Sequence, residues 1–149
     1  MKRRAGFTLI ELLVTLLVVA LLASMAYPSY VGYITKARRA EAQIALLDLM
    51  QQQERFYSQH NSYSEFSSAS TDANEKHFKW YLGDTPAASA YELRGRPCQG
   101  AQIAHCVELQ ALPGTAVVNP NFRDPECETL TLDSAGGRRA QGKSPKCWP

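Results

Sequence analysis

The sequence contains none of the residue patterns that usually identify an enzyme. It has no serine, histidine and aspartate in an order that a supporting motif completes, and no carboxylate pair with a structural reason to lie close. Residues 95–100 include glycines, but neither a helix signal nor a Lys-Ser or Lys-Thr pair follows them, as a phosphate-binding loop requires. We therefore expect neither catalytic residues nor a cofactor.

A metal-binding pattern is missing as well, because no two cysteines have the C-x2-C spacing of a zinc site and the three histidines are scattered. An even number of cysteines in an oxidising compartment favours two disulfides, for which three pairings are possible. We favour Cys98 with Cys106, which would close a short loop between two strand-like segments. The second pair, Cys127 with Cys147, would then tie the C-terminal tail to the last strand.

Acidic residues are absent from the first six positions, which read Met-Lys-Arg-Arg-Ala-Gly. The chain has a formal net charge of +2, with 16 basic and 14 acidic residues. Three of the basic residues lie in this leader, which leaves 13 against 14 in the rest of the chain. The overall charge is therefore no argument for nucleic-acid binding.

Polar interruptions are also rare in residues 7–27, an almost unbroken apolar stretch of 21 residues. As a helix it would be about 32 Å long, enough to cross a hydrocarbon core of about 30 Å. The preceding positive charges favour a cytoplasmic amino end. No cleavage site made of small residues follows a short apolar core, as in an ordinary secretory signal, so we expect the stretch to remain in the mature protein.

Glu11 is the one charged residue within this apolar stretch. A carboxylate is costly in lipid and usually has a partner there. Glu11 is either an interfacial residue that reaches the lipid headgroups or the partner of an amine. A cut after Gly6 would create such an amine on Phe7. Between two staggered chains, the amine of one would meet Glu11 of the next and set the stagger.

The hexapeptide Gly-Phe-Thr-Leu-Ile-Glu at residues 6–11, with its short basic leader and following apolar stretch, resembles the class III signal of type IV pilins and pseudopilins. The resemblance implies that a prepilin peptidase cuts between Gly6 and Phe7 and methylates the new amino end, and that Glu11 acts in assembly. It also implies a single-pass inner-membrane precursor with a cytoplasmic N-terminus. An assembly platform would then add this precursor to an extracellular fibre of pilin subunits.

Helical signals resume after Pro28, so one long helix is predicted from residue 7 to residue 58, with a bend at Pro28. Its predicted polar face includes Arg38 and Arg39. Its apolar stripe is led by residues spaced three and four apart: Ala37, Ala40, Ile44, Leu47 and Met50. Leu46, Leu49 and Phe56 widen this stripe.

A polar loop at residues 59–74 is followed by predicted short strands at residues 79–82, 91–94, 106–110, 115–118 and 128–133. The pattern predicts an α+β fold with the helix packed on a small antiparallel sheet, which is also the fold that the resemblance to pilins implies. The predicted parts are a leader at 1–6, a membrane-spanning or fibre-core half-helix at 7–27, and a globular domain at 28–149.

A second resemblance covers the C-terminal end. Residues 124–127 (Asp-Pro-Glu-Cys), residues 130–134 (Leu-Thr-Leu-Asp-Ser), Gly136 and the pair Cys147-Trp148 are similar to the end of PilE-like minor pilins. This resemblance implies that the second predicted disulfide bounds a C-terminal region and that the chain is a minor pilin. A pseudopilin of a type II secretion system is an alternative, but the major subunits of that machine typically lack such a tail.

A DNA-binding competence pilin is the other alternative. Some related minor pilins are DNA receptors that use a basic face beside a disulfide-bounded C-terminal region. The last 16 residues here hold four positive charges and no acid, namely Arg138, Arg139, Lys143 and Lys146. Arg94 and Arg96 add to that face if the predicted hairpin lies nearby. A solvated tail, or a charged contact with the next pilin, would explain the same residues.

Overall fold

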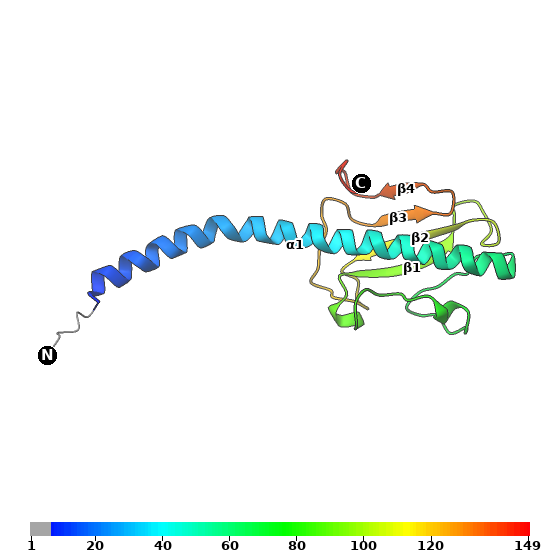
Figure 1. Cartoon of the computed structure of the whole chain (residues 1–149), viewed down its shortest axis with the longest axis horizontal. Coiled ribbons are helices and arrows are strands. Elements are labelled where there is room, and N and C mark those ends of the chain that lie inside the picture. The colour runs from blue at the N-terminus through cyan, green and yellow to red at the C-terminus, as the bar shows by residue number, and fades with distance from the viewer. Residues whose placement is uncertain (1–6) are drawn as a thin grey trace. The chain divides into compact units, whose positions relative to one another are not determined.

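The computed structural model describes residues 7–149, which fall into two compact units divided between Lys36 and Ala37 (Figure 1). The predicted leader, with Gly6, lies outside the described residues.

The predicted long helix is confirmed as α1, Leu9–His60. It begins with a capping box, in which the Thr8 hydroxyl accepts a hydrogen bond from the Glu11 amide and the Glu11 carboxylate accepts one from the Thr8 amide. It ends where Asn61 adopts a left-handed conformation, with φ of 53°, and donates its amide to the Tyr57 carbonyl. The helical conformation continues through Pro28, and a bend there stays a prediction.

Residues 7–36 form the first unit, and nearly all of it is one stretch of helix. Every side chain from residue 7 to residue 24 is exposed, although most of them are large and apolar. Over the described residues, no helix combines the length and apolar character that a membrane crossing needs.

The second unit contains a four-stranded antiparallel sheet with the strands in chain order (Figure 1). The strands are β1 (Tyr91–Pro97), β2 (Val107–Pro113), β3 (Leu130–Asp133) and β4 (Arg138–Ala140). The register places Leu93 opposite Ala111 and Leu109 opposite Leu132. Two short 3-10 helices, Glu75–His77 and Pro86–Ala88, lie in the connection between α1 and β1.

The structure corrects several predicted strands. Residues 79–82 contribute only an isolated bridge, between Tyr81 and Glu92. Residues 115–118 are not a strand but a turn, because Gly114 has a positive φ of 57° and the Val118 amide bonds back to Thr115. Predicted strand 128–133 begins only at Leu130, after Glu128 in a left-handed conformation. Strand β4 was not predicted, since three residues reading Arg-Arg-Ala show no alternation.

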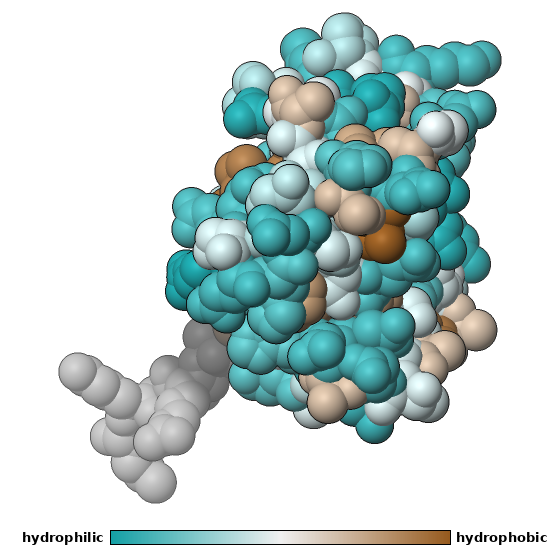
Figure 2. Space-filling model, turned by 90° about the vertical axis from the view of Figure 1, so that its right-hand side faces the viewer, coloured by the Kyte–Doolittle hydropathy of each residue, from teal (hydrophilic) through white to brown (hydrophobic). Residues whose placement is uncertain are grey.

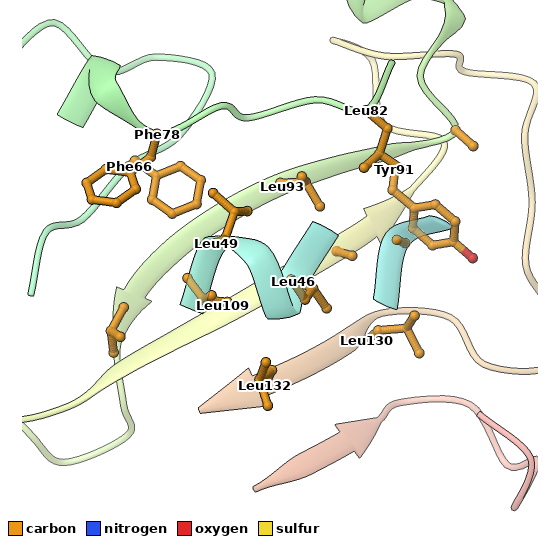
Figure 3. Close-up of a cluster of buried hydrophobic side chains, with 14 of the residues drawn as sticks. Leu46, Leu49, Phe66, Phe78, Leu82, Tyr91, Leu93, Leu109, Leu130 and Leu132 are labelled. Carbon is orange, nitrogen blue, oxygen red and sulfur yellow. The ribbon is translucent and has the colours of Figure 1, made fainter. Parts of the chain in front are cut away.

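The hydrophobic core lies between α1 and one face of the sheet (Figure 3). It is built from Leu46 and Leu49 of α1, the inward residues of the strands, and the rings of Phe66 and Phe78. Gly95 on β1 is required by this packing, because an added Cβ would lie 2.7 Å from the Phe66 ring. The predicted apolar stripe of α1 is buried only in part, at the widening residues Leu46 and Leu49. The buried residues in the second half of α1 are Arg39, Ala42, Leu46, Leu49 and Gln53, whereas Ala37, Ala40, Ile44 and Leu47 are exposed.

Two disulfides join the cysteines in the favoured pairing. Cys98–Cys106 closes the connection between β1 and β2, and Cys127–Cys147 ties the chain end to the segment before β3. The first disulfide therefore joins the end of β1 to the start of β2, and the second joins the segment before β3 to the chain end.

Candidate functional site

The amino end of α1 carries the two predicted assembly residues that the structure describes. Phe7 is exposed, and the Glu11 carboxylate accepts hydrogen bonds from the amide and the hydroxyl of Thr8, both at 3.5 Å. These distances are at the long limit of a hydrogen bond, so the carboxylate is held only weakly within its own chain. It is therefore available to a stronger partner.

The four predicted basic residues at the C-terminal end do not form a single face. Arg138 and Arg139 are neighbours on β4, opposite Leu132 and Thr131 respectively, so their side chains project to opposite sides of the sheet. The Arg138 guanidinium lies 5.7 Å from the Trp148 ring, and the Trp148 indole N–H donates to the Arg139 carbonyl at 2.9 Å. Trp148 thus holds the chain end against β4.

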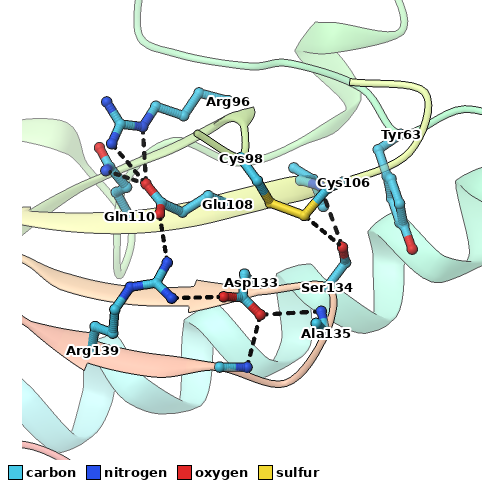
Figure 4. The surroundings of a disulfide bond; sticks show 12 residues. Tyr63, Arg96, Cys98, Cys106, Glu108, Gln110, Asp133, Ser134, Ala135 and Arg139 are labelled. Atoms are coloured by element: carbon cyan, nitrogen blue, oxygen red, sulfur yellow. Dashed lines mark hydrogen bonds and ion pairs between the residues drawn. A yellow bond between two sulfur atoms is a disulfide. The ribbon is translucent and has the colours of Figure 1, made fainter. Parts of the chain in front are cut away.

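Arg139 is engaged on the outward face of the sheet, the face that α1 does not cover (Figure 4). Its guanidinium donates to Glu108 at 2.8 Å and to Asp133 at 2.9 Å. The hydrogen bond to Glu108 and the one to Asp133 raise the pKa of Arg139. Two carboxylates therefore compensate its charge, which leaves little of it for a phosphate.

Lys143 and Lys146 lie in the chain end after β4, and both are exposed. Within residues 7–149, neither they nor Arg138 forms an ion pair with a carboxylate. Of the four predicted residues, these three therefore retain an uncompensated positive charge.

A polar array continues from Arg139 across the outward face to β1. Glu108 accepts from Arg96 at 2.8 and 3.0 Å and from Gln110 at 2.7 Å, and Gln110 accepts from Arg94 at 2.8 Å. Burial alone would raise the pKa of Glu108, but the hydrogen bonds from Arg96 and Arg139 outweigh it and hold the pKa below its ordinary range. Glu108 is therefore an ionised centre shared by two arginines.

A second polar cluster is buried beside α1. Arg39 donates to both carboxylate oxygens of Asp124, at 2.6 and 2.8 Å, and the Tyr91 hydroxyl donates to the same carboxylate at 2.6 Å. Burial alone would raise the pKa of Asp124, but the bonds from Arg39 and Tyr91 keep it below the ordinary value. One turn further along α1, Gln43 donates to the Cys147 carbonyl at 2.7 Å. The helix thus contacts the disulfide-bounded region near both of its ends, at Asp124 and at Cys147.

Arg39 was predicted on the polar face of α1, and that placement is wrong. The signal that could have placed it is its spacing of three and seven residues from Ala42 and Leu46, both buried. Its partner Asp124 is 85 residues away in sequence, and no local pattern connects the two.

The described surface offers no other obvious chemistry. Within residues 7–149, no three His, Cys, Asp or Glu side chains gather closely enough to hold a metal ion. The end of the globular unit at the C-terminus of α1 is mainly hydrophilic, with hydrophobic side chains in small separate spots (Figure 2). The sheet's outward array and the uncompensated basic chain end are therefore the candidate sites.

Comparison with known families gives two matches that adjoin in the sequence. Residues 28–131 match a family described as type IV minor pilin ComP, DNA uptake sequence receptor. Residues 1–27 match the prokaryotic N-terminal methylation motif. Pilins are structural proteins, not known enzymes. A comparison with curated proteins finds no significant match.

The solved structures that are similar to this chain include two pilins. One is the high-resolution structure of a type IV pilin from Shewanella oneidensis, 28% identical, with a TM-score of 0.48, covering 77% of this chain and 98% of that chain. The other is the Neisseria meningitidis non-core minor pilin PilV, 21% identical, with a TM-score of 0.47, covering 77% of this chain and 94% of that chain.

Proposed function

We propose that this chain, which belongs to the family of the type IV minor pilin ComP, is a minor subunit of a pilus. Its leader is cut off between Gly6 and Phe7 before assembly. The observation that carries the proposal is the order of the two matches. The methylation motif covers the basic leader and the apolar stretch, and the minor pilin family covers the globular part that follows. The match of residues 28–131 favours a minor pilin over a pseudopilin, because a pseudopilin shares the N-terminal signal.

Before assembly, residues 7–27 lie in the inner membrane, with the N-terminus in the cytoplasm and residues 28–149 on the periplasmic side. The support for this is the apolar sequence, the basic leader and the exposure of every side chain from residue 7 to residue 24. Prepilin peptidase removes the leader, and the assembly platform transfers the subunit to the fibre, where its apolar side chains are buried against neighbouring pilins.

In the fibre, Glu11 pairs with the Phe7 amine of a neighbouring subunit. Its hydrogen bonds to Thr8 are long, so exchanging them for an ion pair in an apolar fibre core loses little. The pair then fixes the stagger between subunits.

Mass spectrometry of sheared surface fibres tests this function. We expect a small amount of the protein, beginning at a methylated Phe7, and we expect Glu11→Ala to be processed normally but largely lost from the fibres. Glu41→Ala is the matched control, because Glu41 lies on the same helix and forms only an exposed pair with Arg38. Equal incorporation of the two variants would refute the pairing of Glu11.

The cleavage site has its own test. Gly6→Ser is expected to block maturation, which appears as a missing mobility shift on a gel. A normal shift would refute the proposed cut between Gly6 and Phe7.

A second function, DNA reception, is favoured by the uncompensated charges of Lys143 and Lys146 and by the description of the family. Two phosphate contacts predict a slope of log affinity against log salt of about −1.8 for duplex DNA. Each single change to glutamine should reduce this slope by about 0.9. Lys76→Gln, an exposed lysine in the first 3-10 helix, is the control and should leave the slope unchanged. A full-length protein that binds duplex without salt dependence would refute this site.

A further inference from the structure

Two arginines on the outward face of β1 donate hydrogen bonds to side chains of the neighbouring strand β2. Arg94 donates its Nε to Gln110 at 2.8 Å, and Arg96 donates Nε and Nη2 to Glu108 at 3.0 and 2.8 Å. Each acceptor lies on β2, directly opposite its arginine. Each contact uses the Nε side of a guanidinium. Within residues 7–149, the Nη1 atom of each arginine has no hydrogen-bond partner, and Figure 4 shows that end of Arg96 free.

The two acceptors, Gln110 and Glu108, are themselves held by further hydrogen bonds. Gln110 donates to Glu108 at 2.7 Å, and Glu108 also receives Arg139, which a second bond ties to Asp133. The side chain of Glu108 is only 9% exposed, whereas that of Arg96 is 54% exposed. A buried carboxylate thus holds the accessible guanidinium of Arg96 in place. The planar set of N–H donors on this guanidinium, here called the fork, therefore loses little conformational freedom when it binds a ligand.

The charge on this face argues against phosphate as that ligand. The outward residues Arg94, Arg96 and Arg139 are matched in number by Glu92, Glu108 and Asp133. Such a balanced face attracts a polyanion weakly. A planar fork of donors does, however, fit a neutral pair of acceptors, and the O6 and N7 atoms of guanine are such a pair in the major groove.

The spacing and the local shape fit the same ligand. Side chains two residues apart on a strand are roughly 6.7 Å apart, close to two base steps of about 3.4 Å each. Arg96 also borders two hollows, one of about 860 Å³ beside the Cys98–Cys106 disulfide and one of about 310 Å³ that Arg94 also lines. Open space therefore adjoins both arginines.

We propose that Arg94 and Arg96 read guanine edges in duplex DNA, while Lys143 and Lys146 of the chain end contact its phosphates. The inference rests on the proposed DNA reception and divides it into two parts. The balanced array supplies sequence discrimination, and the uncompensated chain end supplies affinity that depends on salt.

The experiment is a selection from a duplex library with a randomised centre, using the full-length protein in detergent. We expect the wild type to enrich a motif with guanines at two positions. Arg96→Lys keeps the charge but loses the fork, so it should relax one position by roughly 5- to 150-fold and leave the salt slope unchanged. Arg94→Lys should relax the other position. Lys143→Gln is the matched control, which should keep the motif and reduce the slope by about 0.9.

Each outcome decides between the two parts. If both lysine variants enrich the wild-type motif without relaxation, the two arginines do not read bases, and DNA reception itself still stands. If the wild type binds duplex but enriches no motif, or binds no duplex, the inference fails together with sequence-specific reception. Thermal unfolding of each variant is measured alongside, because a relaxed motif counts only for a variant that unfolds at the wild-type temperature. The two arginines supply separate tests, so a failure of one variant to fold leaves the other decisive.

Discussion

The two units of this chain differ in how far they expose large apolar side chains to solvent. In residues 7–36 leucines, valines and tyrosines face solvent, whereas in residues 37–149 the large apolar side chains mostly form a closed core. One helix contributes to both, and along it Leu13 is 53% exposed while Leu46 is fully buried. The first unit therefore has a sequence suited to partners outside the chain, and the second has a sequence suited to its own interior.

Charged groups follow the same division. Glu11 of the first unit is exposed and has only long contacts with Thr8, whereas Asp124 of the second unit is buried with three firm hydrogen bonds. A weakly held carboxylate can exchange its partner, as the proposed pairing of Glu11 requires. A buried and fully paired carboxylate instead fixes one structure, because removing its partner leaves a charge without solvent.

The largest expected effect comes from Asp124→Ala, which leaves Arg39 buried without its main partner. We expect the free energy of unfolding of the globular unit to fall by about 3–5 kcal/mol, as measured by denaturant titration. Glu126→Ala is the control, since Glu126 also pairs with Arg39 but is 55% exposed, and an exposed partner contributes only about 0–1 kcal/mol. Equal effects of the two changes would mean that burial does not set the strength of this cluster.

The second prediction compares one substitution in the two units. Leu46→Ala should lower the free energy of unfolding by about 2–5 kcal/mol, because the cavity it leaves is surrounded by core side chains. Leu13→Ala on the same helix should leave the unfolding of the globular unit unchanged, because its side chain has no place in that core. A loss of similar size for Leu13→Ala would contradict the separation of the two units.

The third prediction concerns the disulfides of the second unit. Replacing Cys127 and Cys147 together by serine removes a cross-link between residues 20 apart, and should cost roughly 3 kcal/mol on the chain-entropy account. The same change at Cys98 and Cys106, which are 8 apart, should cost less. Thermal unfolding of the two double variants gives the comparison, and a larger loss for the shorter loop would contradict it.

The sequence predicted the parts of the fold that local patterns govern. The long helix follows from its spacing and its capping box, and β1, β2 and β3 follow from alternation within segments that turn residues bound. Strand β4 was not predicted because its residues show no alternation, and the contacts that hold Arg138 and Arg139 come from side chains outside the strand, namely Trp148, Glu108 and Asp133.

The buried stripe of α1 shows the same limit. Two apolar stripes run along this half of the helix, and the one that is buried contains Arg39 and Gln53. Their polar groups are satisfied by Asp124 and by the backbone of Ser64, which lie on other segments. Sequence periodicity without those partners favours leading residues that carry no charge, and most of those leading residues are exposed.

The candidate site divides in a similar way. The basic composition of the chain end is visible in the sequence, but whether each charge is free depends on register. Arg139 meets two carboxylates only because β2, β3 and β4 pair as they do, and Arg138 avoids them by facing the other side of the sheet.

The smallest expected effect is the response of the second unit to acid. The pKa of Asp124 and that of Glu108 are lower in the folded protein than their ordinary values of 3.8 and 4.5. Each ionised group therefore stabilises the fold fully above its ordinary pKa, and this contribution is lost as the pH falls below about 4.5 toward the lowered values. We expect the midpoint of thermal unfolding to be constant near neutral pH and to fall in that acidic range. Glu108→Gln should flatten the part of the fall that begins near pH 4.5, whereas Glu11→Gln should leave the whole profile unchanged, because Glu11 belongs to the unit without a core.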